Sequence, residues 1–206
     1  MEAHTPYPVT LTIDYPDRDL DRASTLLRPL LVVPVAILFA LVSGPTAHAG
    51  DSRIVFESGG VVFAATALML AFRGKYPRWW FDWNAAVTRF GLRVAAYAGL
   101  LTDEYPSTDE EQSVHLEITY PNAAELSRGL PLVKWLLVFP HLVVLSLLCV
   151  GAVFVVLAAW PTILFTGRYP RSLFDYVVGV LRWWVRVAAY AVLLVTDRYP
   201  PFRLAA

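Results

Sequence analysis

The stretch that decides the fold of this chain occurs in two versions. The second version reads Phe165-Thr-Gly-Arg-Tyr-Pro-Arg-Ser-Leu-Phe-Asp175, and the first reads Phe72-Arg-Gly-Lys-Tyr-Pro-Arg-Trp-Trp-Phe-Asp82. In each version two arginines follow the aspartate at the same spacing of seven and then four residues: Arg89 and Arg93 in the first, Arg182 and Arg186 in the second. Residues at these spacings fall on one side of a helix, so each version predicts a helix with an arginine stripe.

The similarity extends upstream and downstream of this stretch. Residues 7–16 and residues 113–121 both alternate apolar and polar side chains and end in Tyr-Pro, and each version closes on a Thr-Asp-x-Tyr-Pro sequence. Repetition over such a length indicates a duplicated structural unit. The sequence therefore predicts two tandem membrane repeats, residues 7–106 and residues 113–200, joined by the acidic segment 107–112.

The two alternating segments predict short strands. Each has one apolar face, formed by Val9, Leu11 and Ile13 in the first segment and by Val114, Leu116 and Ile118 in the second. We expect antiparallel pairing, because a two-fold axis along the membrane normal reverses direction within the membrane plane. A two-stranded ribbon alone is marginally stable, so its apolar face must rest on the arginine-striped helices or on another subunit.

The composition is that of a membrane protein. Hydrophobic residues make up 57% of the chain and charged residues 17%, against about 25% charged in soluble domains. The apolar residues lie in blocks, which favours a bilayer over a large soluble core. The formal net charge is zero, so the charge balance does not favour nucleic acid as a partner. The single cysteine excludes a disulfide framework, and the N-terminus lacks the basic segment of a cleaved signal peptide.

The apolar blocks lie between each strand and each arginine-striped helix. In the first repeat they are Pro29–Val42 and Val61–Phe72, separated by a polar insert at residues 43–58, and in the second repeat one block runs from Leu136 to Phe165. We interpret each set as an apolar helical hairpin, with a bend at residues 149–152 in the second repeat. That block is short for two crossings of ~20 residues each, so a single long crossing is the alternative.

The direction of the repeats depends on the arginine-striped helices. If these helices lie on the membrane surface, the repeats are parallel, and if they cross, the repeats are inverted. Basic residues near membrane segments prefer the cytoplasmic side. The parallel arrangement places only Arg53 of the seventeen basic residues in an outer loop, whereas the inverted one also exposes Arg128, Lys134, Arg168 and Arg171 there. We therefore predict an all-α integral membrane protein with four crossings, two interfacial helices, a small two-stranded antiparallel cap and both termini cytoplasmic.

The pattern Gly167-Arg-Tyr-Pro-Arg-x-Leu-Phe-Asp175, with the arginine-bearing helix and the closing Thr196-Asp-Arg-Tyr-Pro-Pro-Phe202, resembles a known family. It is the bacterial membrane family catalogued as domain of unknown function 4389. The resemblance is strongest over residues 135–202, and the first repeat departs from it at Arg73, at Lys75 and at its Trp-Trp pair. The resemblance implies an integral protein of the bacterial inner membrane and carries no activity to transfer.

Arginines at matched places in the two repeats are the candidate lipid-binding residues. They are Arg78, Arg89, Arg93, Arg171, Arg182 and Arg186. One interpretation is an amphipathic interfacial helix whose arginines reach toward the headgroups. A second is a paired site in which the guanidinium groups bind phosphates of anionic lipids. The third is internal pairing with Asp82 and Asp175, seven residues before the stripe.

Tyr-Pro dipeptides and tryptophans are the other recurrent features. The residue before a proline avoids the helical region, so each Tyr-Pro marks the boundary of an element. Tryptophans near basic residues indicate an interfacial belt on the cytoplasmic side. His141 follows Pro140 in an apolar block, where we expect it to hydrogen-bond a backbone carbonyl freed by that proline.

Catalytic signatures do not occur in the sequence. It has no nucleophile elbow, no phosphate-binding glycine loop and no zinc-ligand spacing. We therefore expect a non-enzymatic protein without cofactor or metal. It would bind anionic lipid or a membrane protein partner at the inner leaflet, as a scaffold or accessory subunit, or form a homo-oligomer. A small transporter or lipid-moving protein is the second hypothesis, and an enzyme acting on lipid is the third.

Overall fold

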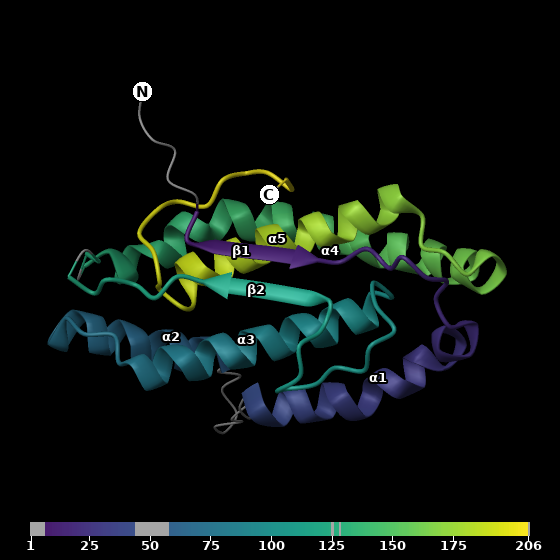
Figure 1. The fold of residues 1–206 in the computed structure, drawn as a ribbon. Helices are drawn as coiled ribbons and strands as arrows, with labels where there is room; N and C mark the ends of the chain where they lie inside the picture. Colours follow the sequence, from purple (N-terminus) through teal and green to yellow (C-terminus); the bar gives the residue numbers. More distant parts are fainter. Residues whose placement is uncertain (1–6, 44–57, 125, 128, 206) are drawn as a thin grey trace, which may run out of the picture.

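The computed structural model (Figure 1) describes residues 7–43, 58–124, 126–127 and 129–205. These residues are mostly helical, with one small antiparallel sheet. In chain order the elements are β1 (Val9–Ile13), α1 (Arg22–Ser43), α2 (Ser58–Leu68), the π-helix η1 (Met69–Arg73), α3 (Arg78–Ala98), β2 (Val114–Ile118), α4 (Leu130–Thr166) and α5 (Arg171–Ala191).

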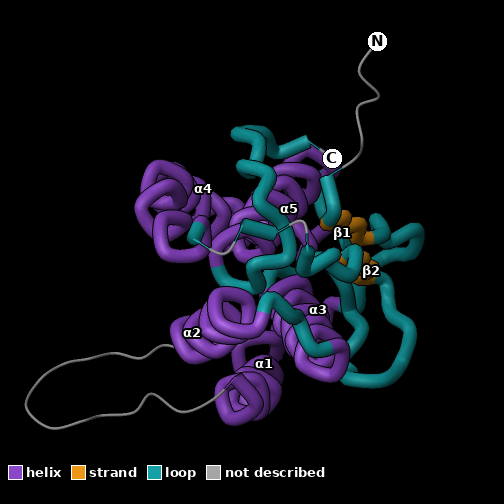
Figure 2. Tube along the Cα trace, turned by 90° about the vertical axis from the view of Figure 1, so that its left-hand side faces the viewer, coloured by secondary structure: helices purple, strands orange, loops and turns teal. Residues whose placement is uncertain are grey.

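The elements form three layers that run along a common axis. Viewed along that axis (Figure 2), the strands lie on one side of the molecule, α3 and α5 lie in the middle, and α1, α2 and α4 lie on the other side. β1 packs on α5 and β2 packs on α3, while α4 packs on α5 and α1 packs on α3. The hydrophobic core lies mainly between the sheet and the two middle helices.

The two strands pair as the sequence predicts. β1 and β2 are antiparallel, with Leu11 opposite Leu116. The side chains of Val9, Leu11, Val114 and Leu116 are buried against α3 and α5, because these two helices cover one face of the sheet. The alternate residues, such as Thr12, are exposed on the outer face. The prediction that the apolar face of the ribbon is covered is therefore confirmed.

α3 and α5 have the same length and begin in the same way. Each starts directly after a Tyr-Pro, with Pro77 and Pro170 in the extended conformation at φ −62° and −60°. Proline restricts the preceding tyrosine to non-helical angles, so the helix cannot extend further toward the N-terminus. Shortly after each helix the chain turns through a residue with positive φ, Leu100 at 63° and Leu194 at 55°. Such angles are uncommon for leucine and are held here by the surrounding packing.

The hairpin predicted for the second half of the chain is wrong. α4 is one continuous helix of 37 residues, and Pro140 and Pro161 lie inside it. The expected bend at residues 149–152 does not form, because α4 packs along α5 and the Tyr176 hydroxyl donates a hydrogen bond to the Leu148 carbonyl there. The expectation of four crossings, two of them in this half, is wrong for the same reason. In the first half, the turn of the expected hairpin lies outside the described residues.

Two of the described helices are long and apolar enough to cross a membrane by length and composition. They are α1 and residues Val133–Thr166 of α4. Most of their side chains are exposed, including Leu136 and Phe154 of α4 and Leu30 of α1. A core helix of a soluble protein would be mostly buried, so these helices present an apolar surface that nothing in the described chain covers.

Candidate functional site

Two buried cations hold the outer helices to the middle layer. The side chain of Arg28, on α1, is 3% exposed, and its guanidinium forms an ion pair with the Asp103 carboxylate. It also donates a hydrogen bond to the Thr102 carbonyl at 2.7 Å and lies 4.0 Å from the centre of the Tyr97 ring. Tyr97 lies in the last turn of α3, and Thr102 and Asp103 follow that helix, so these contacts fix α1 against its end.

Lys134, on α4, makes the same set of contacts in the second half. Its ammonium group lies 2.8 Å from the Asp197 carboxylate and donates to the Thr196 carbonyl at 2.7 Å. It also lies 4.7 Å from the centre of the Tyr190 ring. Neither role was predicted from the sequence. The sequence does contain a signal for both cations. A lone basic residue lies six residues before a proline of each apolar block: Arg28 before Pro34, and Lys134 before Pro140.

The arginine stripes of α3 and α5 bind the backbone of distant segments. Arg89 donates to the Leu116 carbonyl of β2 at 3.3 Å, and Arg182 donates to the Leu11 carbonyl of β1 at 2.9 Å. These are the central residues of the two paired strands. The stripes therefore attach the sheet to the middle helices, a role that none of the three interpretations from the sequence included.

The second arginine of each stripe is almost fully buried. Arg93 donates to the Ser107 carbonyl and Arg186 donates to the Ala205 carbonyl, each at 2.6 Å. Burial is the main cause that lowers the pKa of both guanidinium groups, and the carbonyl contacts compensate for part of this desolvation. These two arginines hold the segments that follow the helices, and their side chains are not on the surface.

The arginines of the two Tyr-Pro-Arg turns are exposed and lie over tyrosine rings. The guanidinium of Arg78 lies 4.8 Å from the centre of the Tyr120 ring, and that of Arg171 lies 4.5 Å from the centre of the Tyr15 ring. Asp175 lies 3.6 Å from Arg171, four residues earlier, and not from the stripe. The interpretation that Asp175 pairs with the stripe is therefore wrong, and in the described part of the chain no ion pair joins Asp82 to the stripe either.

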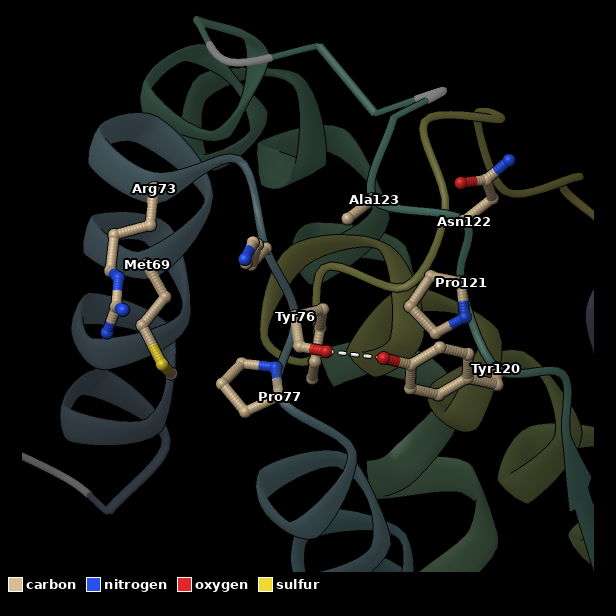
Figure 3. A pocket seen from close by; sticks show the side chains of 9 residues that line it. Met69, Arg73, Tyr76, Pro77, Tyr120, Pro121, Asn122 and Ala123 are labelled. Atoms are coloured by element: carbon tan, nitrogen blue, oxygen red, sulfur yellow. Dashed lines mark hydrogen bonds between the residues drawn. The ribbon is translucent and has the colours of Figure 1, made fainter.

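A pocket of about 590 Å³ opens at the first Tyr-Pro turn. It is lined by Met69, Arg73, Lys75, Tyr76, Pro77, Tyr120, Pro121, Asn122 and Ala123. In Figure 3, Met69 and Arg73 come from η1 on one side, Tyr120 to Asn122 come from the segment after β2 on the other, and Tyr76 lies between them.

The tyrosines of this pocket are held by backbone hydrogen bonds. The Tyr120 hydroxyl donates to the Tyr76 carbonyl (Figure 3), and the buried Tyr76 hydroxyl donates to the Leu193 carbonyl at 2.8 Å. Burial raises the pKa of Tyr76 well above its usual value, so this hydroxyl remains a donor at physiological pH. The two rings therefore form fixed walls, while Arg73 and Lys75 are exposed at the surface.

The turn at Gly167 is closed by a carboxylate from the segment between β1 and α1. Arg168 lies 2.9 Å from the Asp19 carboxylate, and the Leu20 amide donates to the Gly167 carbonyl at 2.7 Å. Gly74 and Gly167 both have positive φ, so the backbone of the two turns is alike. The two turns differ in that Arg73 and Lys75 pair with no carboxylate among the described residues.

The described residues contain no cluster of histidine, cysteine, aspartate or glutamate that could hold a metal ion. His141 accepts a hydrogen bond from the Trp183 indole at 3.0 Å and stacks on the Phe202 ring. The expectation that it binds a carbonyl freed by Pro140 is therefore wrong. The tryptophans do not form a single belt, since Trp183 is buried while Trp79 is exposed.

The family model described as a domain of unknown function, DUF4389, matches residues 131–203. The match covers α4, α5 and the closing Tyr-Pro segment, and it names the family that the motifs resemble. No curated protein and no solved structure matches the chain.

Proposed function

We propose, from the premise that residues 131–203 belong to the DUF4389 family, that this chain is an integral membrane protein that lies flat in one leaflet. The exposed faces of α1, α2 and α4 would lie in the hydrocarbon, and the outer face of the sheet would face the cytoplasm. Its role would be non-enzymatic: it would bind anionic lipid or a protein partner at the inner leaflet, as a scaffold or accessory subunit.

The observation that carries this proposal is the common direction of sheet and helices. The outer face of the sheet is polar, with Thr10, Thr12 and Glu117 exposed. Because all elements run along one axis (Figure 2), a helix that crossed the bilayer along its normal would carry this polar face into the hydrocarbon. Unpaired polar groups are strongly disfavoured there. A flat orientation places the apolar layer in the lipid and the sheet in water.

The length of α4 supports the same orientation. At 1.5 Å per residue a helix of 37 residues is ~55 Å long, whereas the hydrocarbon core is only ~30 Å thick. A crossing would need a steep tilt or would leave apolar turns in water on both sides. A helix that lies in the membrane plane has no such limit on its length.

We propose further that the two halves are tandem repeats related by a two-fold axis along the membrane normal. Matched contacts support this proposal. Arg28 and Lys134 make the same three contacts in their own halves. Arg89 binds the central residue of β2, and Arg182 binds the central residue of β1. An axis through the centre of the sheet would exchange the members of each pair.

The exposed arginines of the Tyr-Pro turns favour the cytoplasmic leaflet. Arg78 and Arg171 lie at the borders between the apolar layer and the sheet layer, where lipid headgroups would be. Basic residues at this depth prefer the cytoplasmic side, and each contributes about 1 kcal/mol of attraction to an anionic surface. Both ends of the described chain would then be cytoplasmic, since the Tyr7 hydroxyl contacts the Arg198 carbonyl at 3.3 Å.

The depth of three positions along α4 tests the orientation. Leu136, Leu147 and Leu157 are exposed and span ~32 Å of the helix. Each is changed to cysteine in a Cys149→Ser background, labelled with an environment-sensitive fluorophore, and quenched by lipids brominated at known acyl depths. We expect all three labels at similar depth. Thr12→Cys, on the outer face of the sheet, is the control and should escape quenching.

A crossing helix would give a different pattern. Leu147→Cys would then be quenched at the bilayer centre, while the labels at 136 and 157 would be quenched near opposite headgroups. That result would refute the flat orientation. Quenching of the Thr12→Cys label by lipid would refute the assignment of the sheet to the aqueous side.

A further inference from the structure

We propose that the pocket at the first Tyr-Pro turn binds the phosphate-bearing headgroup of an anionic phospholipid. This inference rests on the membrane orientation proposed above and assigns the lipid to a defined site. The site differs from the arginine stripes, whose guanidinium groups are engaged by the backbone. Its cations are Arg73 and Lys75, and Arg78, which is not among the lining residues, lies over the ring of Tyr120, which is.

The first argument is positive charge that no described carboxylate pairs with. Arg73, Lys75 and Arg78 lie within six consecutive residues, and the described residues that line the pocket include no acid. Like charges this close repel each other, and an anion bound between them offsets that repulsion. At the turn around Gly167, Asp19 supplies that anion to Arg168. At the turn around Gly74 a pocket is open instead, and none of the described carboxylates pairs with Arg73 or Lys75.

The second argument concerns the walls of the pocket. The Tyr76 and Tyr120 rings are fixed by backbone hydrogen bonds, and Pro77 and Pro121 restrict the backbone on either side (Figure 3). The pocket therefore does not need to be ordered by its ligand. Its volume of about 590 Å³ lies within the range of ~300–1,000 Å³ that is typical of small-molecule sites.

The third argument explains why the phosphate should belong to a lipid. Apolar side chains occur in and next to the segment that forms the pocket: Met69 lines it, and Phe72 and Trp79, adjacent in the chain to Arg73 and Arg78, are 82% and 70% exposed. Large exposed aromatic residues beside cations are typical of the membrane interface. The pocket lies between η1, in the apolar layer, and the segment after β2, in the sheet layer. A headgroup would therefore enter the pocket while its acyl chains extend along α2.

Lipid retention by the full chain tests this site. The protein is purified in detergent, titrated with dioleoyl phosphatidylglycerol, and analysed by native mass spectrometry, with the zwitterionic dioleoyl phosphatidylcholine as the comparison. Arg73→Gln with Lys75→Gln removes two exposed charges. At about tenfold per 1.4 kcal/mol, and about 1 kcal/mol per cation, phosphatidylglycerol binding should weaken roughly thirty-fold. Arg18→Gln with Arg22→Gln removes two exposed charges elsewhere, and this control should bind as the wild type does.

A second variant tests the comparison with the turn around Gly167. Lys75→Glu places a carboxylate beside Arg73, as Asp19 lies beside Arg168. We expect this variant to lose phosphatidylglycerol binding and to keep or raise its melting temperature. Unchanged phosphatidylglycerol binding in both pocket variants would overturn the proposal, as would equal binding of phosphatidylcholine by the wild type.

The source of the phosphate is distinguished by competition. Glycerol 3-phosphate presents a similar phosphate without acyl chains and should displace phosphatidylglycerol only at much higher concentration. Displacement at equal concentration would overturn the lipid assignment and identify a soluble phosphate ester as the ligand. The depth pattern along α4 does not depend on this pocket. Its survival in the Arg73→Gln, Lys75→Gln variant separates failure of the site from failure of the proposed orientation.

Discussion

Replacing Asp103 with asparagine should destabilise the protein strongly, because it removes one member of a buried ion pair. The Asp103 side chain is 12% exposed and forms its ion pair with Arg28, and its second oxygen accepts a hydrogen bond from the Asp21 amide at 2.7 Å. Asparagine is close in shape but carries no charge. The substitution therefore leaves the Arg28 guanidinium buried without a counter-ion.

The size of the expected loss of stability depends on the contacts that Arg28 retains in the variant. Breaking a buried pair by removal of one partner costs about 3–5 kcal/mol. Arg28 keeps the Thr102 carbonyl and the face of the Tyr97 ring, so we expect the lower end, about 3 kcal/mol. For a chain of this size each 1 kcal/mol shifts the melting temperature by about 2–4 °C, so the expected fall is roughly 6–12 °C.

Thermal unfolding in detergent, followed by circular dichroism, measures this fall. Asp82→Asn is the matched control, since Asp82 is exposed on α3 and the change should stay within about 0.5 kcal/mol of wild type. Replacing both members, Arg28→Met with Asp103→Leu, should recover most of the loss, because no charge then remains buried. If the Asp103→Asn variant had the same melting temperature as the wild type, the ion pair would not hold α1 to the end of α3.

Two further changes test the sheet and the turn around Gly167. Leu116→Asp should cost ~2 kcal/mol or more, because it buries a polar group without a partner, and Thr12→Asp on the outer face should have little effect in the same denaturant titration. Gly167→Ala should cost about 1–2 kcal/mol, since φ is +76° and the new Cβ would lie 3.3 Å from Asp19. Gly129→Ala is the control, because no atom lies within 4 Å of the new Cβ, and it should have the melting temperature of the wild type. Equal melting temperatures of the two glycine variants would contradict the backbone strain expected in Gly167→Ala.

The parts of the fold that were predicted correctly depend on local chemistry. The alternation around Leu11 and Leu116 predicted the strands and their buried faces, and the antiparallel pairing was correct. The Tyr-Pro dipeptides predicted the starts of α3 and α5, because proline excludes the residue before it from the helix.

The errors concern features that neighbouring residues do not determine. Nothing in the apolar block 136–165 distinguishes a hairpin from a single helix. In both arrangements the backbone groups that lie in lipid are hydrogen-bonded within helices. The contact of α4 with α5, and the hydrogen bond from Tyr176 to Leu148, decide for one helix. The arginine partners were missed for a related reason. Any backbone carbonyl can accept from a guanidinium, so periodicity places the arginines on a face without naming their acceptors.

By itself, the sequence determined which residues share a face, where elements begin, and that the chain carries more apolar surface than a soluble core needs. Only the tertiary structure decided that Arg28 and Asp103, seventy-five residues apart, form one buried pair, and that sheet and helices share a direction. It also decided that one Tyr-Pro turn is closed by Asp19 while the other opens into a pocket. The physical reason is range: dihedral preferences act between neighbours, whereas ion pairs, carbonyl contacts and pockets depend on which distant segments the fold brings together.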